Sequence, residues 1–108
     1  MKKLLSVLIL ASSLFASNAM VDGMKAWNAV EAGEKQYSRV DAGFFLGYVF
    51  GVKNTLNNII FCIPKEVPSK QILNIVADYV KNNPDQWSKS YTSLVITPLK
   101  EVYPCPKK

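Results

Sequence analysis

Cys62 and Cys105 are the residues of this 108-residue chain with the most distinctive chemistry. A cysteine pair can supply a thiol nucleophile, bind a metal ion or form a disulfide. The chain has no histidine, which is the commonest general base and a frequent zinc ligand. The sequence therefore predicts a protein that is not an enzyme and holds no metal or other cofactor, with catalysis by a reduced Cys62 as the alternative.

Residues 1–19 have the pattern of a secretory signal peptide. Lys2-Lys3 form a basic start, residues 4–15 are apolar, and Ser17-Asn18-Ala19 has the small-x-small pattern of a cleavage site. The apolar stretch is shorter than the ~20 residues that span a bilayer, which argues against a membrane anchor. We expect cleavage after Ala19, leaving residues 20–108 as one domain in the periplasm, with no membrane span.

Export bears directly on the cysteines, because a lone cysteine pair in a small domain usually forms a disulfide under oxidising conditions. Hydrophobic burial leaves a domain of about 90 residues with a small net stability. Closing the loop between Cys62 and Cys105 should stabilise it by about 4 kcal/mol in the chain-entropy model. We therefore predict one structural disulfide, Cys62 to Cys105.

The charged residues are scattered along the chain. The net charge of +5 includes no basic run longer than two residues, which is typical of a solvated surface and not of a nucleic-acid-binding stripe. Glu31 and Glu34 are the closest acidic pair at helical spacing, and a solvated helix face explains them better than an acid-base pair. The composition therefore favours a protein partner over a nucleic acid.

Apolar residues recur at spacings of three and four, which predicts an all-α domain. We expect a first helix over residues 20–33 and a central helix over residues 38–60. A third helix should run from Ser69, as its N-cap, to about Asn82. About four helices are expected in total, with the disulfide joining the end of the central helix to the C-terminus.

The fourth predicted helix begins with Asn83 as a cap and Pro84 at the first helical position. It carries Trp87, Tyr91 and Leu94 on one side. Pro98 should kink or break it near Ile96, because proline removes a backbone hydrogen bond.

Gly43, Gly47 and Gly51 repeat every four residues of the central helix, so they lie along one face. Such a face lets another backbone approach closely. Each glycine costs about 1 kcal/mol relative to alanine inside a helix, so we expect the face to serve close packing. An internal helix crossing is the favoured interpretation, and a partner's helix or a second copy of the chain is the alternative.

Four segments together resemble a known family. They are residues 43–51 (GFFLGYVFG), residues 61–64 (FCIP), residues 71–84 and Tyr103-Pro104-Cys105. In this order and spacing, over residues 37–106, the chain is similar to the Rap/Tai family of small periplasmic immunity proteins associated with type VI secretion amidases. The resemblance implies an all-helical, disulfide-bonded inhibitor, often a homodimer, that blocks the active-site cleft of a cognate peptidoglycan amidase toxin.

The resemblance also implies a protruding loop that enters the cleft of the toxin. We nominate the turn between the third and fourth predicted helices as this loop. Its candidate residues are Asn82, Asn83, Asp85, Gln86 and Trp87. An ordinary capped helix connection is the alternative, and Trp87 is expected to anchor the core more than to contact the toxin.

The alternative function is that of a periplasmic helical chaperone or stress protein of the acid-activated kind. Such a protein needs carboxylates whose protonation at low pH drives unfolding or dissociation. Here 8 acidic residues are outnumbered by 13 basic ones, and they do not cluster. The sequence therefore favours the immunity protein.

Overall fold

The computed structural model describes residues 18–107, which form four α-helices and one short 3-10 turn. The elements are α2 (Ala19–Glu31), α3 (Arg39–Leu56), α4 (Ser69–Asn82), η1 (Pro84–Gln86) and α5 (Tyr91–Val102). Within this range the backbone forms no sheet, only an isolated bridge between Asn57 and Phe61. The predicted all-α fold is confirmed. Most of the predicted leader lies outside the described residues, which begin at Asn18.

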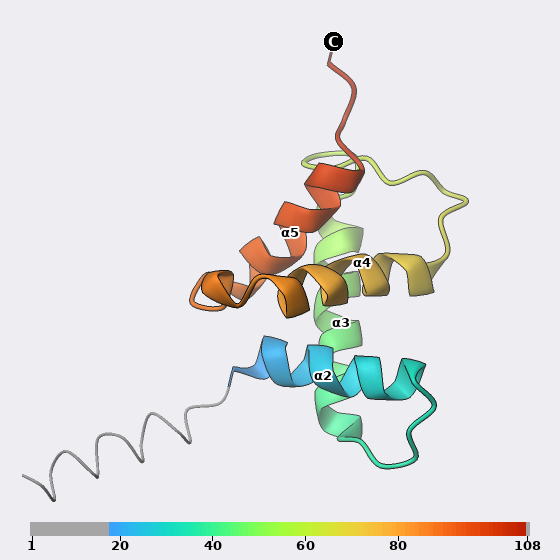
Figure 1. The fold of residues 1–108 in the computed structure, drawn as a ribbon. Helices are drawn as coiled ribbons and strands as arrows, with labels where there is room; N and C mark the ends of the chain where they lie inside the picture. The colour runs from blue at the N-terminus through green and yellow to red at the C-terminus, as the bar shows by residue number, and fades with distance from the viewer. Residues whose placement is uncertain (1–17, 108) are drawn as a thin grey trace, which may run out of the picture.

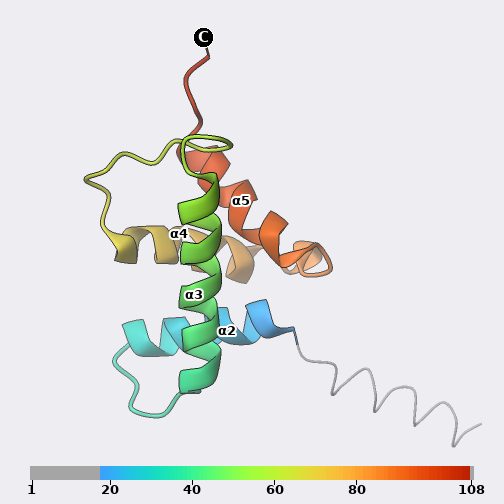
Figure 2. The same cartoon turned by 180° about the vertical axis from the view of Figure 1, so that it is seen from behind.

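The helix α3 forms the central column of the fold (Figure 1). Both α2 and α4 cross it on one side, α2 near its beginning and α4 nearer its end, while α5 packs against α4. Seen from behind, α3 has no other helix in front of it (Figure 2). One side of α3 is thus covered and the other is open. No helix in the described range is long and apolar enough to cross a membrane.

The core fills the space between α3 and the helices that cover it. Phe45 and Val49 of α3 have no exposed surface. The other largest fully buried side chains are Met20, Phe61, Ile72, Val76, Val80, Leu94, Val95 and Leu99. On α4 the buried residues recur every four positions, which is the helical spacing that predicted this helix.

The ends of α3 and α4 depend on local backbone chemistry. Ser38 starts α3, because its Oγ accepts a hydrogen bond from the backbone N of Asp41 at 3.1 Å. The helix ends at Leu56, earlier than predicted, because the backbone of Asn57 is extended, with a φ of −62° and a ψ of 136°. Asn58 follows with a φ of 69°, in the left-handed region that asparagine tolerates. The prediction of Ser69 as an N-cap was wrong: it is the first residue of α4, and Pro68 occupies the cap position.

The predicted fourth helix is divided in two. The 3-10 turn η1 ends at Gln86, and α5 begins only after Ser90, whose Oγ accepts from the backbone N of Ser93 at 3.1 Å. The helix does not break near Ile96 as expected. Instead, α5 continues through Pro98 to Val102. Pro98 is buried, and packing of the apolar face holds the helix despite the missing hydrogen bond.

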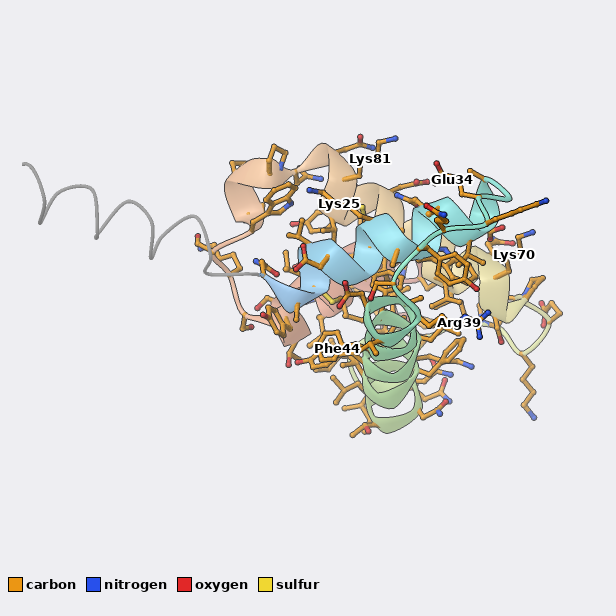
Figure 3. The ribbon with its side chains drawn as sticks, turned by 90° about the horizontal axis from the view of Figure 1, so that it is seen from below. Lys25, Glu34, Arg39, Phe44, Lys70 and Lys81 are labelled. Carbon is orange, nitrogen blue, oxygen red and sulfur yellow. A yellow bond between two sulfur atoms is a disulfide. The ribbon has the colours of Figure 1, made fainter. Side chains whose placement is uncertain are left out.

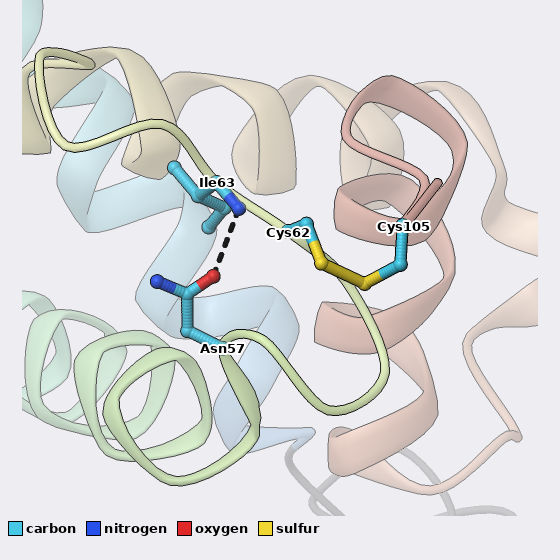
Figure 4. Close-up of a disulfide and its surroundings, with 4 residues drawn as sticks. All are labelled: Asn57, Cys62, Ile63 and Cys105. Atoms are coloured by element: carbon cyan, nitrogen blue, oxygen red, sulfur yellow. Dashed lines mark hydrogen bonds between the residues drawn. A yellow bond between two sulfur atoms is a disulfide. The ribbon is translucent and has the colours of Figure 1, made fainter. Parts of the chain in front are cut away.

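Cys62 and Cys105 form the predicted disulfide, with Cα atoms 4.8 Å apart. The bond joins the segment after α3 to the segment after α5 (Figure 4). The backbone N of Cys62 donates to the carbonyl O of Tyr103 at 2.8 Å, and the backbone N of Ile63 donates to Oδ1 of Asn57 at 2.8 Å. The disulfide therefore links two segments that are also held together by a backbone hydrogen bond.

The helices α2 and α3 approach closely at Gly23, a residue that no spacing pattern in the sequence marks. A Cβ at this position would lie 2.8 Å from Cβ of Phe45 and 3.0 Å from the carbonyl O of Asp41. Carbon atoms in contact are ordinarily 3.5–4.0 Å apart, so an added methyl group would force the helices to shift. The close crossing therefore uses a glycine of α2.

Replacing Gly23 with alanine is expected to lower the free energy of unfolding by about 1–3 kcal/mol, because overpacking outweighs the better helix propensity. The matched control is Gly43→Ala, since a Cβ on Gly43 would have no neighbouring atom within 4 Å. Denaturant unfolding at a concentration where the chain is monomeric should show Gly43→Ala unchanged or stabilised. Equal free energies of unfolding for the two variants would contradict the close approach of α2 and α3 at Gly23.

Candidate functional site

Hydrogen bonds hold the nominated turn at both ends. Asn82 is the last residue of α4, and the backbone of Asn83 leaves the helical conformation. Nδ2 of Asn83 donates to the carbonyl O of Tyr79 at 2.8 Å, which ties the turn to α4. The backbone N of Gln86 donates to the carbonyl O of Asn83 at 2.9 Å and closes η1. The turn thus has a defined conformation before any partner binds.

The polar side chains of the turn face solvent. Asn82 and Asp85 are exposed, and Gln86 is half-buried. Nε2 of Gln86 donates to Oδ2 of Asp85 at 2.9 Å. The turn lies at one edge of the fold, away from the disulfide end of the molecule (Figures 1 and 2). It presents amide and carboxylate groups that a protein partner can bind.

Trp87 anchors this turn from the inside. Its Nε1 donates to the carbonyl O of Val80 at 2.6 Å, and its ring packs against the hydrophobic core. Trp87 follows η1 and precedes α5, so it is not part of the continuous helix that the sequence suggested. Its expected packing against the core is nevertheless observed.

A groove of 460 Å³ lies beside the turn, between α2 and the end of α4. Trp87 lines it together with Lys25, Lys81 and Glu34. Figure 3 shows these three charged residues along the same edge of the molecule. The groove has apolar walls and more positive than negative charge, which suits a protein segment with acidic groups.

The glycine face of α3 is open. A Cβ on Gly43, Gly47 or Gly51 would meet no other atom within 4 Å, so the internal crossing expected there is not formed. The buried residues of α3 are Ala42, Phe45 and Val49. At 100° of rotation per residue, Gly43 lies about 100° around the helix from Ala42, and Gly47 and Gly51 each lie about 160° from Val49. The glycine face is thus available to another molecule.

Three aromatic rings border this open face. The ring centroids of Phe44, Tyr48 and Tyr91 lie 5.6, 6.0 and 5.9 Å apart, within the range of favourable aromatic pairs. The hydroxyl of Tyr48 shares a hydrogen bond of 2.7 Å with Oγ1 of Thr92 on α5. Beside them a groove of 460 Å³ runs along Gly47 and the following turns of α3. This forms a second surface that could contact a protein.

Ionisable groups are spread thinly over the described part of the chain. Among residues 18–107, no three Cys, Asp or Glu side chains gather as a metal site requires, and both cysteine sulfurs are bonded to each other. In the same range one ion pair is present, between Nζ of Lys70 and Oε2 of Glu31 at 3.1 Å. The groups that the turn and grooves offer are suited to protein contact.

Asn18 lies within the predicted leader, so its contacts with the folded domain were not expected. Its Nδ2 donates to the carbonyl O of Trp87 at 2.9 Å, inside the candidate turn. An asparagine just before a helical period is a signal for an N-cap. The overlapping pattern of a cleavage site hid this signal.

Comparison with known families bears on what these surfaces bind. The family model described as Rap1a immunity proteins matches residues 17–105, a range that contains all the helices described above. This chain belongs to the Rap1a immunity protein family. The suspected membership of the Rap/Tai immunity proteins is thereby confirmed. No curated protein and no solved structure matches the chain. A Rap1a immunity protein acts by binding a toxin, which makes the turn and the two grooves candidate contact surfaces.

Proposed function

We propose that this Rap1a family protein is a periplasmic immunity protein that inhibits a type VI secretion peptidoglycan amidase by blocking its active-site cleft. The observation that carries the proposal is the family match over residues 17–105. The secretory pattern of residues 1–19 supports a periplasmic location. Peptidoglycan lies in that compartment, so an inhibitor there meets the toxin beside its substrate.

The turn after α4 is the part of the surface best suited to enter a cleft. Its conformation is held by the side chains of Asn83 and Trp87, through the bonds to the carbonyl O atoms of Tyr79 and Val80. A segment that is ordered before binding loses little conformational entropy in the complex. The exposed Asn82 and Asp85 then supply polar contacts that fix its orientation.

Inhibition of this kind needs no chemical step from the immunity protein. An amidase admits a peptide substrate into its cleft, and a turn that occupies the cleft excludes that substrate. The groove beside Trp87 would add contact area, because a stable interface buries about 800 Å² on each partner. Lys25 and Lys81 at the groove rim would favour an acidic patch on the toxin.

A protection assay in cells tests this function. Export of the cognate amidase to the periplasm is expected to lyse cells, and co-expression of this protein should restore growth. A catalytically dead amidase controls for the burden of export. Lysis that continues while the immunity protein accumulates in the periplasm would contradict the proposal.

We also propose that the protein forms a homodimer through the glycine face of α3. Gly43, Gly47 and Gly51 have open space above them, and small residues let two helix backbones approach closely. Sedimentation at tens of micromolar is expected to give a dimer, and Gly47→Arg should shift it to a monomer without loss of helix. A monomeric wild-type protein would contradict this interface.

Stability in acid separates this function from that of an acid-activated chaperone. No charged residue is buried as a whole among the described residues, although Oε1 of Glu31 has no exposed surface. The pair of Lys70 with Glu31 is partly exposed, so it contributes at most about 1 kcal/mol. Protonating the carboxylates should therefore cost little stability. Circular dichroism between pH 2 and 3 is expected to show retained helix. Reversible loss of helix with client binding would favour the chaperone.

A further inference from the structure

A cleft of 470 Å³ lies between the last turn of α3 and the loop that leads to α4. Its lining includes two lysines, two asparagines and two apolar residues: Lys53, Lys65, Asn57, Asn58, Ile63 and Val67. Figure 1 places this loop away from the turn after α4. The volume lies within the range of small-ligand sites, and the inhibition proposed above makes no use of this cleft.

Hydrogen bonds and the disulfide fix the walls of the cleft. Oδ1 of Asn57 accepts from the backbone N of Ile63 at 2.8 Å (Figure 4). The backbone N of Asn58 donates to the carbonyl O of Phe61 at 2.7 Å. Between these contacts, Cys62 is bonded to the C-terminal segment. The cleft is therefore formed before a ligand arrives, which lowers the entropic cost of binding.

The charged side chains of the cleft are all positive. Lys53 is half-buried in the last turn of α3, and Lys65 is exposed in the loop. Among the described residues no Asp or Glu lines the cleft. The one ion pair within residues 18–107 joins Lys70 to Glu31, so no carboxylate neutralises either lysine of the cleft.

The end of α3 reduces this positive charge only in part. A helix C-terminus carries a partial charge of about −0.5, which is smaller than two full ammonium charges. The backbone N of Asn57 also donates to the carbonyl O of Lys53 at 2.9 Å, and the backbone N of Ile60 donates to the carbonyl O of Leu56 at 3.1 Å. The cleft therefore keeps a positive potential that attracts an anion.

The uncharged lining indicates which anion fits. Ile63 and Val67 offer an apolar wall. The amide side chains of Asn57 and Asn58 can pair with the N–H and C=O groups of a peptide, and Nδ2 of Asn57 points away from Ile63 (Figure 4). No aromatic ring of the described chain lines the cleft, so it offers no platform on which a nucleobase could stack. These groups match a carboxylic acid with an amide-linked apolar body.

We propose that this cleft binds the free carboxylate end of a short peptide with an apolar side chain. The carboxylate is held by the ammonium groups of Lys53 and Lys65, and the apolar side chain packs against Ile63 and Val67. The protein then has two separate sites, the turn for its toxin and the cleft for a soluble peptide. This second site does not depend on the proposed inhibition.

NMR titration of the isotope-labelled, oxidised protein with acetyl-Ala-Ala-Leu tests the site. A Kd of about 0.1–1 mM is expected for a ligand of this size, with shift changes confined to residues 53–67. The same peptide with an amidated end lacks the charge and should bind at least about tenfold more weakly. Equal binding of the two peptides, or no shift changes at about 10 mM peptide, well above the expected Kd, would overturn the site. Sodium acetate that binds as tightly as the peptide would overturn the peptide assignment.

Substitutions then locate the binding charge. Lys53→Gln and Lys65→Gln should each weaken peptide binding by about tenfold, because each removes one charge-assisted contact. Asn58→Asp should weaken it by a similar factor, since aspartate tolerates the left-handed φ of 69° and adds a negative charge to the cleft. Lys89→Gln is the matched control, because Lys89 is exposed beside the turn. An equal loss in Lys89→Gln would show a response to net charge alone and overturn the site.

An inhibition assay separates this proposal from the immunity function. The double variant Lys53→Gln/Lys65→Gln should inhibit the cognate amidase as the wild type does, because the cleft lies away from the turn. Peptide binding by a protein that does not inhibit the amidase would contradict the immunity function alone. Inhibition by a protein that does not bind the peptide would overturn the cleft alone.

Discussion

Replacing Asn82, Asp85 and Gln86 together with alanine is expected to weaken binding of the cognate amidase by about 100-fold or more. These side chains form the polar surface of the turn that is proposed to enter the cleft, and contacts at the centre of an interface dominate affinity. Asn82 and Asp85 are exposed, so the folded state should lose little, within about 0.5 kcal/mol for each substitution. Calorimetric titration measures the affinity, and thermal unfolding checks the fold.

A matched variant in the loop between α3 and α4 controls for the effect on affinity of removing polar surface side chains in general. Lys65 and Glu66 are exposed residues between α3 and α4, and Figure 1 places this loop away from the turn. Their replacement with alanine should leave the affinity within about twofold of the wild type, as for surface changes outside an interface. Equal affinity of the turn variant and this control would show that the toxin is bound elsewhere.

Replacing Cys62 or Cys105 with serine is expected to lower the free energy of unfolding by about 2–5 kcal/mol. The disulfide closes a loop with a sequence separation of 43, so its loss gives the unfolded chain much more freedom. The double variant should be no less stable than the less stable single variant, because all three lack the same bond.

Urea unfolding of the oxidised protein and the three variants measures this effect. Because the disulfide lies away from the turn, the folded fraction of each variant should still bind the amidase. Unchanged unfolding midpoints in the serine variants would contradict a stabilising role for the bond.

The helices were predictable because each has an apolar stripe at helical spacing. The end of α4 at Asn82 agrees with the prediction, and its beginning at Ser69 is one residue earlier than a cap at Ser69 implied. Pro68 and the Asn-Pro step limit the helix on both sides. The disulfide was predictable because a leader and a lone cysteine pair together indicate an oxidising compartment. Local signals were sufficient for these features.

The sequence could not show whether the glycine face packs inside the fold or stays open. Glycine spacing indicates that another backbone can approach, but not whether that backbone belongs to the same chain. The single Gly23 that forms the α2–α3 crossing has no spacing pattern to mark it. Trp87 and Tyr91 are four residues apart, which imitates a helical period across a connection that is not α-helical.

The candidate site was predictable in part. The turn itself follows from its polar residues and the Asn-Pro step, and the structure places it at the surface with a hydrogen-bonded conformation. The groove beside it could not be predicted, because Lys25 and Lys81 meet only when α2 packs against α4. Asn18 was assigned to the leader since one short segment carries both a cleavage pattern and a helix cap.

The most direct test of the central claim is calorimetric titration of the mature protein with its proposed cognate peptidoglycan amidase, with hydrolysis measured in parallel. Binding with a nanomolar Kd and loss of hydrolysis at equimolar ratio are predicted, as for a specific inhibitor that occupies the cleft. Absence of binding at micromolar concentrations, or binding that leaves hydrolysis unchanged, would contradict the proposed inhibition.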